Sequence, residues 1–199
     1  MKTEHFEILV EEPSMEAFLV ELLPRLLTET TFTVHVYQGK RDLLNKLQAR
    51  LRGYAKWLPA NARIVVLIDR DDDDCAALKK QLERDATVAG LPTRSRGVAG
   101  WRVVNRIAIE ELEAWFFGEW ASVRQAYPKV PATIAKKAPY RNSHTINGGT
   151  WEALERVLKR AGYFSGGLRK VELATAIGRH FDHKVCVSAS FNAFRNVLT

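Results

Sequence analysis

The segment Ile64–Asp74, with the sequence IVVLIDRDDDD, constrains the possible folds of this chain more than any other part. Five apolar residues, mostly β-branched, run without interruption into a block of carboxylates. A short apolar run of this kind is typical of a strand that is buried on both faces of a parallel sheet. Open parallel sheets bind ligands at the carboxyl edge of their strands, where Asp69 and Asp71 would lie.

Hydrophobic patterns elsewhere predict a repeated strand-helix order. Strands are expected over residues 6–11, 32–37, 63–69 and 101–109, with amphipathic helices between them. This order predicts an α/β fold with a mostly parallel, Rossmann-like sheet of about four strands and helices on both faces. Further helices are expected over residues 110–119, 151–161, 170–181 and 188–198. We therefore expect an α/β domain over residues 1–119 and a helical C-terminal extension, residues 120–199, packed on it.

The net charge of +7 is unevenly distributed along the 199 residues. Residues 1–119 hold 17 Lys and Arg against 19 Asp and Glu, whereas residues 120–199 hold 13 against 4. A basic extension beside an acidic centre indicates a polyanionic partner such as nucleic acid, and a basic surface that only aids solubility is the alternative. The residues that we expect to contact nucleic acid are Lys136, Lys137, Arg141, Arg169 and Lys170.

Lys170 differs from the other four basic residues because it opens a predicted helix. A cation at the positive end of a helix dipole is unfavourable unless an anion lies nearby. We therefore expect an anionic group close to this side chain.

The sequence also predicts the cellular environment. Cys75 and Cys186 form neither a disulfide framework nor a metal-binding spacing. No apolar run is long enough to span a bilayer, and the first residues lack the features of a signal peptide. We expect a cytoplasmic protein in a reducing environment that does not associate with membranes.

Carboxylates follow two of the predicted strands. Glu11 ends the first strand, and Asp69 and Asp71 end the third. Both strand ends lie at the same edge of a parallel sheet, and a divalent cation relieves the repulsion between carboxylates gathered there. We predict a Mg²⁺ or Mn²⁺ site, with Asp73 as a further candidate ligand. The alternative is a solvated acidic loop that begins a helix, because Asp is a good N-cap residue.

Four motifs together resemble a family of small Toprim-like bacterial proteins of unassigned function. The motifs are EEPSMEAFL at 11–19, LIDRDDDDC at 67–75, AIEELEAWFFGE at 108–119 and SASFNAF at 188–194. Members of that family are often encoded beside an AAA-type ATPase in defence loci. Residues 6–110 also resemble the Toprim domain of topoisomerases, bacterial primases and nucleases of the overcoming-lysogenization-defect type, which has a glutamate after its first strand and DxD after its third.

The resemblance implies roles for individual residues. It implies Asp69 and Asp71 as metal ligands, and Glu11 as a further ligand or a general acid or base. It also implies a functional place for Glu113, with a second metal site as a candidate role; a solvent-facing helix glutamate is the alternative. The sequence departs from the Toprim pattern at two positions, since Glu12 replaces the usual glycine and Met15 stands where defence nucleases often carry a second acid. Asp73 or Glu113 is a candidate replacement for that acid.

These features predict a metal-dependent phosphodiester hydrolase that acts on DNA or RNA. The resemblance further implies an effector of phage defence with an AAA-type ATPase partner, and a homodimer is a candidate assembly. The alternative is a non-catalytic nucleic-acid or nucleotide-binding module that works with the ATPase. A transferase such as a primase or ligase is a third hypothesis. The sequence has no primase zinc motif and no Gly-Lys phosphate loop, which argues against it.

Overall fold

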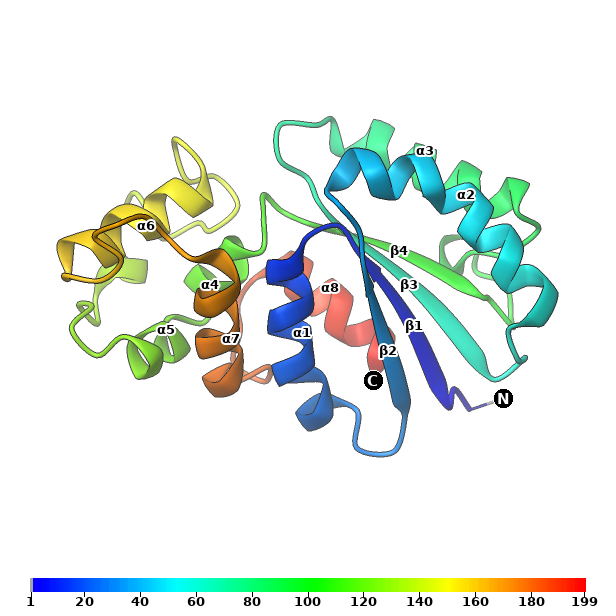
Figure 1. Cartoon of the computed structure of the whole chain (residues 1–199), viewed down its shortest axis with the longest axis horizontal. Coiled ribbons are helices and arrows are strands. Elements are labelled where there is room, and N and C mark those ends of the chain that lie inside the picture. Colours follow the sequence, from blue (N-terminus) through cyan, green and yellow to red (C-terminus); the bar gives the residue numbers. More distant parts are fainter. Residues whose placement is uncertain (1) are drawn as a thin grey trace.

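A four-stranded parallel sheet forms the centre of the computed structural model, which describes residues 2–199 (Figure 1). Its strands are β1 (His5–Val10), β2 (Thr31–Val36), β3 (Ala62–Asp69) and β4 (Val103–Ala108). They lie in the order β2-β1-β3-β4, and Ile8 pairs with Val34 on one side and with Val65 on the other. The predicted Rossmann-like α/β fold is confirmed.

Helices cover both faces of the sheet. The connecting helices are α1 (Pro13–Leu26), α2 (Lys40–Trp57) and α3 (Cys75–Val88). Figure 1 shows α2 and α3 over one face, and α1 with α8 (Ala189–Leu198) over the other. All eight residues of β3 are buried, and successive side chains enter opposite cores. Ile64 and Val66 contact the α2 and α3 side, whereas Val65 and Leu67 contact the α1 side, as expected for a strand covered on both faces.

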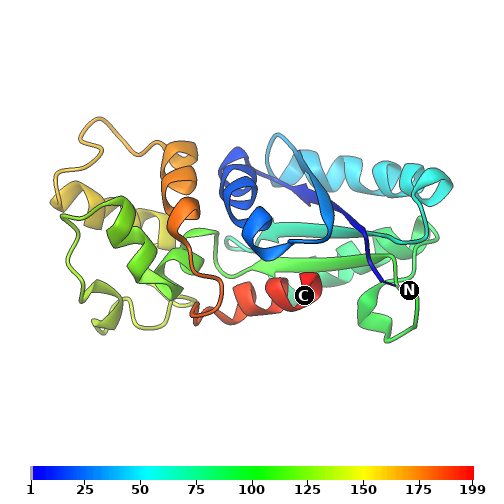
Figure 2. The same ribbon diagram turned by 90° about the horizontal axis from the view of Figure 1, so that it is seen from below.

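The C-terminal residues form further helices that share the core on the α1 side. They are α4 (Glu113–Gly118), α5 (Trp120–Ala126), α6 (Thr150–Arg160), α7 (Lys170–His180) and α8, with a short 3₁₀ turn at Ile134–Lys136 (η2). Another 3₁₀ turn, Arg94–Arg96 (η1), lies between α3 and β4. α7 packs along α1, and α8 returns to pack on β4 (Figure 2). A Cβ atom at Gly178 of α7 would lie 3.1 Å from the carbonyl oxygen of Phe18 in α1. The two helices therefore approach closely at this glycine.

Most predicted element bounds differ from the structure by one residue, and larger differences occur between residues 101 and 126. The fourth strand begins at Val103 and not at Trp101, and α4 begins only at Glu113. The short helix α5 was not predicted. Only Glu119 separates it from α4, so the sequence shows no loop between the two helices. The carboxylate of Glu119 accepts a hydrogen bond from the Ser122 amide at 3.1 Å and so starts the new helix.

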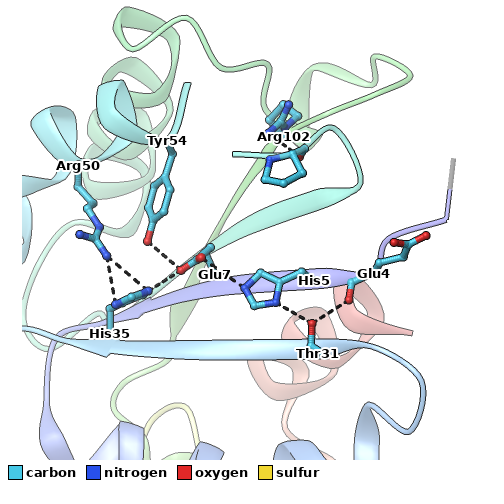
Figure 3. Close-up of polar contacts among 9 residues, drawn as sticks. Glu4, His5, Glu7, Thr31, His35, Arg50, Tyr54 and Arg102 are labelled. Atoms are coloured by element: carbon cyan, nitrogen blue, oxygen red, sulfur yellow. Dashed lines mark hydrogen bonds and ion pairs between the residues drawn. The ribbon is translucent and has the colours of Figure 1, made fainter. Parts of the chain in front are cut away.

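A polar network ties α2 to the sheet through the buried side chain of Glu7 (Figure 3). Tyr54 donates a hydrogen bond to this carboxylate at 3.0 Å, and the ring of His35 pairs with it. Arg50 donates to Nδ1 of His35 at 3.2 Å, which leaves Nε2 of the ring to donate to Glu7. Burial would raise the pKa of Glu7, but the hydrogen bonds from His35 and Tyr54 outweigh it and lower the pKa. Glu7 is therefore a buried carboxylate whose partners are all supplied by the fold.

The length and polarity of the helices also bear on membrane association. No helix within residues 2–199 has both the length and the apolar character required to cross a bilayer.

Candidate active site at the carboxyl edge of the sheet

Three buried carboxylates, which we call the buried acid cluster, meet at the carboxyl edge of the sheet. Glu11 follows β1, Asp69 ends β3 and Glu113 begins α4. Their exposed fractions are only 4%, 7% and 3%. The predicted approach of the first and third strand ends is therefore confirmed. The alternative of a solvent-facing Glu113 is wrong, because α4 turns this residue into the protein.

Asp69 is the most strongly perturbed member of the cluster. Burial raises its pKa well above the usual value, and the negative charges of Glu11 and Glu113 raise it further. The Oδ1 atom of Asp69 is buried and accepts no hydrogen bond from any residue between 2 and 199. A buried carboxylate oxygen without a donor is costly for a fold. This oxygen is therefore suited to bind a cation.

Glu11 is fixed against the end of β3. Its carboxylate accepts a hydrogen bond from the backbone amide of Asp69. Burial raises the pKa of Glu11 to about 7, and this hydrogen bond and the charge of Lys40 oppose the rise. Glu11 and Asp69 therefore form a directly connected pair.

Glu113 lies opposite Lys170, the first residue of α7. Burial raises the pKa of Glu113 to about 7, against the opposing effect of Lys170. The ammonium nitrogen of Lys170 lies 3.6 Å from a carboxylate oxygen of Glu12 and 4.8 Å from the ring centroid of Trp151. The anion expected near this lysine is thus provided by the carboxylates of the protein itself.

The exposed aspartates of the same edge bind Lys40. The ammonium nitrogen of this lysine lies 2.6 Å from Asp71 and 2.7 Å from Asp73, and both aspartate side chains are half exposed. Asp71 has a φ of 49°, in the left-handed region that Asp tolerates better than most residues. Asp74 accepts a hydrogen bond from the Ala77 amide at 2.6 Å and caps α3. The helix-capping alternative therefore describes Asp74, but not the buried Asp69.

The chemistry of the donors fits a hard divalent cation. Carboxylate oxygens are the ligands that Mg²⁺ and Mn²⁺ prefer, and Asp69 offers an oxygen with no other partner. The side chains as they stand form no cluster of three or more His, Cys, Asp and Glu residues around a metal position within residues 2–199. Glu11 and Asp69 are the pair best placed to hold an ion, whereas Asp71 and Asp73 would first have to release Lys40.

A polar pocket of about 630 Å³ opens beside this edge. Arg70 and Glu110, which form an ion pair at 3.1 Å, line it together with the loop 144–149. Glu111 also lines it and accepts hydrogen bonds from the Thr150 hydroxyl at 2.8 Å and the Trp151 amide at 3.0 Å. Glu111 thereby holds the start of α6 beside the carboxyl edge.

Three of the predicted nucleic-acid contacts form one exposed group, which we call the basic loop: Lys136, Lys137 and Arg141. The guanidinium of Arg141 donates to the carbonyl oxygen of Lys136 at 3.4 Å. Arg169 is also exposed, but its side chain pairs with Glu172 at 3.0 Å. Lys170 lies at the acid cluster. Arg169 and Lys170 thus each pair with carboxylates of the protein, whereas the three residues of the basic loop form no ion pair with any residue between 2 and 199.

Sequence reasoning missed Lys40 and the capping role of Glu111. Lys40 stands just after β2, so its position at a strand end was a usable signal for the same edge of the sheet. No comparable signal marked Glu111, because its partners lie about forty residues later in the chain.

Comparison with known proteins gives one match. A family model described as Domain of unknown function (DUF4276) matches residues 10–199. A search of the curated proteins and a search of the solved structures found no match. The matched residues include the whole buried acid cluster, the basic loop and α8. The chain belongs to the DUF4276 family.

Proposed function

We propose that the protein is a Mg²⁺- or Mn²⁺-dependent phosphodiester hydrolase that acts on DNA or RNA. The observation that carries this proposal is the unpartnered, buried Oδ1 atom of Asp69, beside Glu11 and Glu113 at the carboxyl edge of a parallel sheet. Similar carboxyl edges are the usual ligand sites of open α/β sheets. The resemblance to Toprim domains supports the same assignment.

Glu11 and Asp69 would hold the ion through their carboxylate oxygens. When bound, such an ion polarises a phosphoryl oxygen and lowers the pKa of its coordinated water. Asp71 is the candidate third ligand, and Asp73 the candidate ligand of a second site. Both would exchange Lys40 for the metal, and Lys40 would then be free to contact a substrate phosphate.

Glu113 is our candidate for proton transfer. A general acid or base works best when its pKa lies near the operating pH, and burial raises the pKa of Glu113 to about 7. Lys170 lies close enough to stabilise the carboxylate form. Glu113 would take up or release a proton at its carboxylate while the phosphodiester is cleaved. Glu11, whose pKa is also about 7, is the alternative acid or base.

The basic loop would contact the sugar-phosphate backbone. Its three cations are exposed, and the whole positive excess of the chain lies in residues 120–199, since residues 1–119 are net negative. Contacts of this type give affinity that falls as the salt concentration rises. The AAA-type ATPase partner and the role in phage defence are supported only by the family resemblance.

A second candidate function is a non-catalytic module that binds nucleic acid or nucleotides together with an ATPase. It is favoured by the lysines at the carboxyl edge, since Lys40 forms ion pairs with Asp71 and Asp73 and Lys170 lies against Glu12. These ion pairs balance part of the acidic charge without a metal.

A cleavage experiment tests the hydrolase proposal. The purified protein is incubated with plasmid, single-stranded DNA and total tRNA, each with Mn²⁺, Mg²⁺ or EDTA. We expect metal-dependent cleavage that Asp69→Asn lowers by about a thousandfold, which corresponds to about 4 kcal/mol of transition-state stabilisation. Asp85→Asn is the matched control, because Asp85 is also buried, but lies on α3.

Mn²⁺ binding, measured by calorimetry, separates the two candidate functions. The hydrolase requires binding by the wild type that is lost in Asp69→Asn and kept in Asp85→Asn. A wild-type protein that neither cleaves nor binds Mn²⁺ would contradict the hydrolase and favour the binding module.

A further inference from the structure

The opposite edge of the sheet, at the amino ends of the strands, carries two neighbouring arginines. Arg63 is the second residue of β3, and Arg102 directly precedes β4. Ile64 pairs with Val103, so Arg63 and Arg102 face each other one position earlier across adjacent strands. Like charges in such a cross-strand pair are unfavourable.

Arg63 is a buried cation that has no carboxylate partner among residues 2–199. Its exposed fraction is 5%, and its Nη1 atom donates to the carbonyl oxygens of Ala60 at 2.7 Å and Ala62 at 2.9 Å. Its Nε atom is buried and has no hydrogen-bond partner in the described part of the chain. Burial lowers its pKa, and the charge of Arg102 lowers it further. Buried charges are normally paired, so this arrangement calls for an anion.

Arg102 is bound in a similar way. Its Nη2 atom donates to the carbonyl oxygens of Leu58 at 2.8 Å and Pro59 at 3.0 Å, where α2 ends. A cation at the end of a helix is favourable, and one guanidinium is sufficient for that role. This role at the helix end does not explain why a second arginine lies there. It also does not explain why the Nε atom of Arg102 is buried without a hydrogen-bond partner among residues 2–199.

The two arginines line a pocket of about 490 Å³ together with Gly100 and Trp101. The ring centroid of Trp101 lies 5.3 Å from the guanidinium carbon of Arg63 and 5.5 Å from that of Arg94. Cation–π contacts of this kind restrain a guanidinium without neutralising it. The pocket therefore presents positioned positive charge.

We propose that this pocket at the amino edge binds a phosphate group, with Arg63 and Arg102 as its ligands. Guanidinium forks match the oxygens of a phosphate, and an anion between the two arginines would remove their mutual repulsion. The pocket also has room for the group to which the phosphate is attached. A free nucleotide and a polynucleotide backbone present the same phosphate chemistry.

This phosphate site is separate from the carboxyl edge. Arg63 and Asp69 stand six residues apart on β3, which corresponds to about 20 Å along a strand. The proposal therefore does not depend on the proposed hydrolase, and EDTA separates the two in an experiment.

Calorimetric titration of the full chain with inorganic phosphate, at low ionic strength in EDTA, tests the proposal. We expect measurable binding by the wild type and a Kd at least tenfold higher for Arg102→Gln and for Arg63→Lys. The second variant keeps the charge but loses the planar fork. Arg84→Gln removes one exposed arginine from α3, and its Kd should stay within twofold of the wild type.

Adenosine monophosphate and a single-stranded oligonucleotide without terminal phosphates then identify the source of the phosphate. Tighter binding of either one, weakened by Arg102→Gln, supports the site and names its ligand. The proposal would be overturned if the wild type did not bind phosphate or if the Kd of Arg102→Gln were unchanged. It would also be overturned if Arg84→Gln lost as much phosphate affinity as Arg102→Gln. If circular dichroism shows that Arg63→Lys is unfolded, the partly exposed Arg102 decides the outcome.

Discussion

The two edges of the sheet both gather charges of one sign, but they compensate them differently. At the carboxyl edge, the lysines Lys40 and Lys170 lie against the carboxylates. At the amino edge, Arg63 and Arg102 donate only to main-chain carbonyl groups as far as residues 2–199 are concerned. Side-chain ion pairs can be exchanged for a ligand, whereas main-chain hydrogen bonds also hold the fold together. Removal of a charge should therefore raise the stability of the fold at the carboxyl edge and lower it at the amino edge.

The largest effect on stability that we expect comes from Glu83, a carboxylate on α3 that contacts β4 through Asn105. Burial would raise its pKa, but hydrogen bonds from Ser95 and Thr93, with Asn105 and Lys79, outweigh burial and lower the pKa to about 2. A lowered pKa in the folded state adds stability above the usual value of 4.5, and this stability is lost as the pH falls toward 2. Because the side chain of Glu83 is partly exposed, solvent screening reduces the full value of this shift to about 2–3 kcal/mol. Urea unfolding between pH 2 and pH 6 should show that loss in the wild type and a flatter profile in Glu83→Gln.

Parallel pH profiles for the two proteins would mean that Glu83 is not stabilised in its charged form. Hydrogen-bond donors would then not explain why the pKa of Glu83 is lowered while the pKa values in the buried acid cluster, which has fewer donors, are raised.

The substitution Arg63→Met should destabilise the protein by about 2 kcal/mol, because the carbonyl groups of Ala60 and Ala62 lose their donor. Urea unfolding at pH 7 measures this change, and Arg84→Met controls for the loss of an arginine at an exposed position. An increase in stability would show that repulsion from Arg102 outweighs these hydrogen bonds.

The smallest expected effect is stabilisation by Asp69→Asn in the absence of metal. The substitution removes one of three buried acidic groups and should raise the free energy of unfolding at pH 8 by about 1 kcal/mol, or the Tm by about 2–4 °C. The pKa of Asp69 is raised in the folded state, so the penalty is absent at low pH and grows as the pH rises. The difference should therefore shrink at pH 5.

Calorimetric scans in EDTA at both pH values measure this difference, with Asp85→Asn as the matched control. Added Mn²⁺ should then stabilise the wild type more than Asp69→Asn. A lower Tm for Asp69→Asn at pH 8 would contradict the view that the carboxyl edge is destabilised by its own charges.

The positions of Glu11 and Asp69 could be predicted because each follows an apolar run, and parallel strands end at one edge. The partners of Asp71 and Asp73 could not, because Lys40 reaches them from the start of α2, about thirty residues earlier. The charge of Lys170 indicated a nearby anion, but not that Glu12 and Glu113 would provide it.

Two of the motifs behind the family resemblance pack against each other, which their separation in sequence did not reveal. The indole nitrogen of Trp115 donates to the Ser190 hydroxyl at 2.9 Å, and a Cβ atom at Gly118 would lie 3.0 Å from the Cβ atom of Ser188. These residues hold α4 against the segment that leads into α8. They therefore support the position of Glu113 indirectly.

The position of β3 between its two neighbours has a consequence for how reliably the chain folds. The central residues Ile64–Ile68 are apolar on both sides of the sheet, so a shift of the strand by one residue would still bury apolar side chains in both cores. Arg63 and Asp69 are already buried at the two ends of this run, and a shift would move one of them from its strand end into the apolar core at a large desolvation cost. The two charged residues to which we assign ligand binding thus also favour the native register of β3 over registers shifted by one residue.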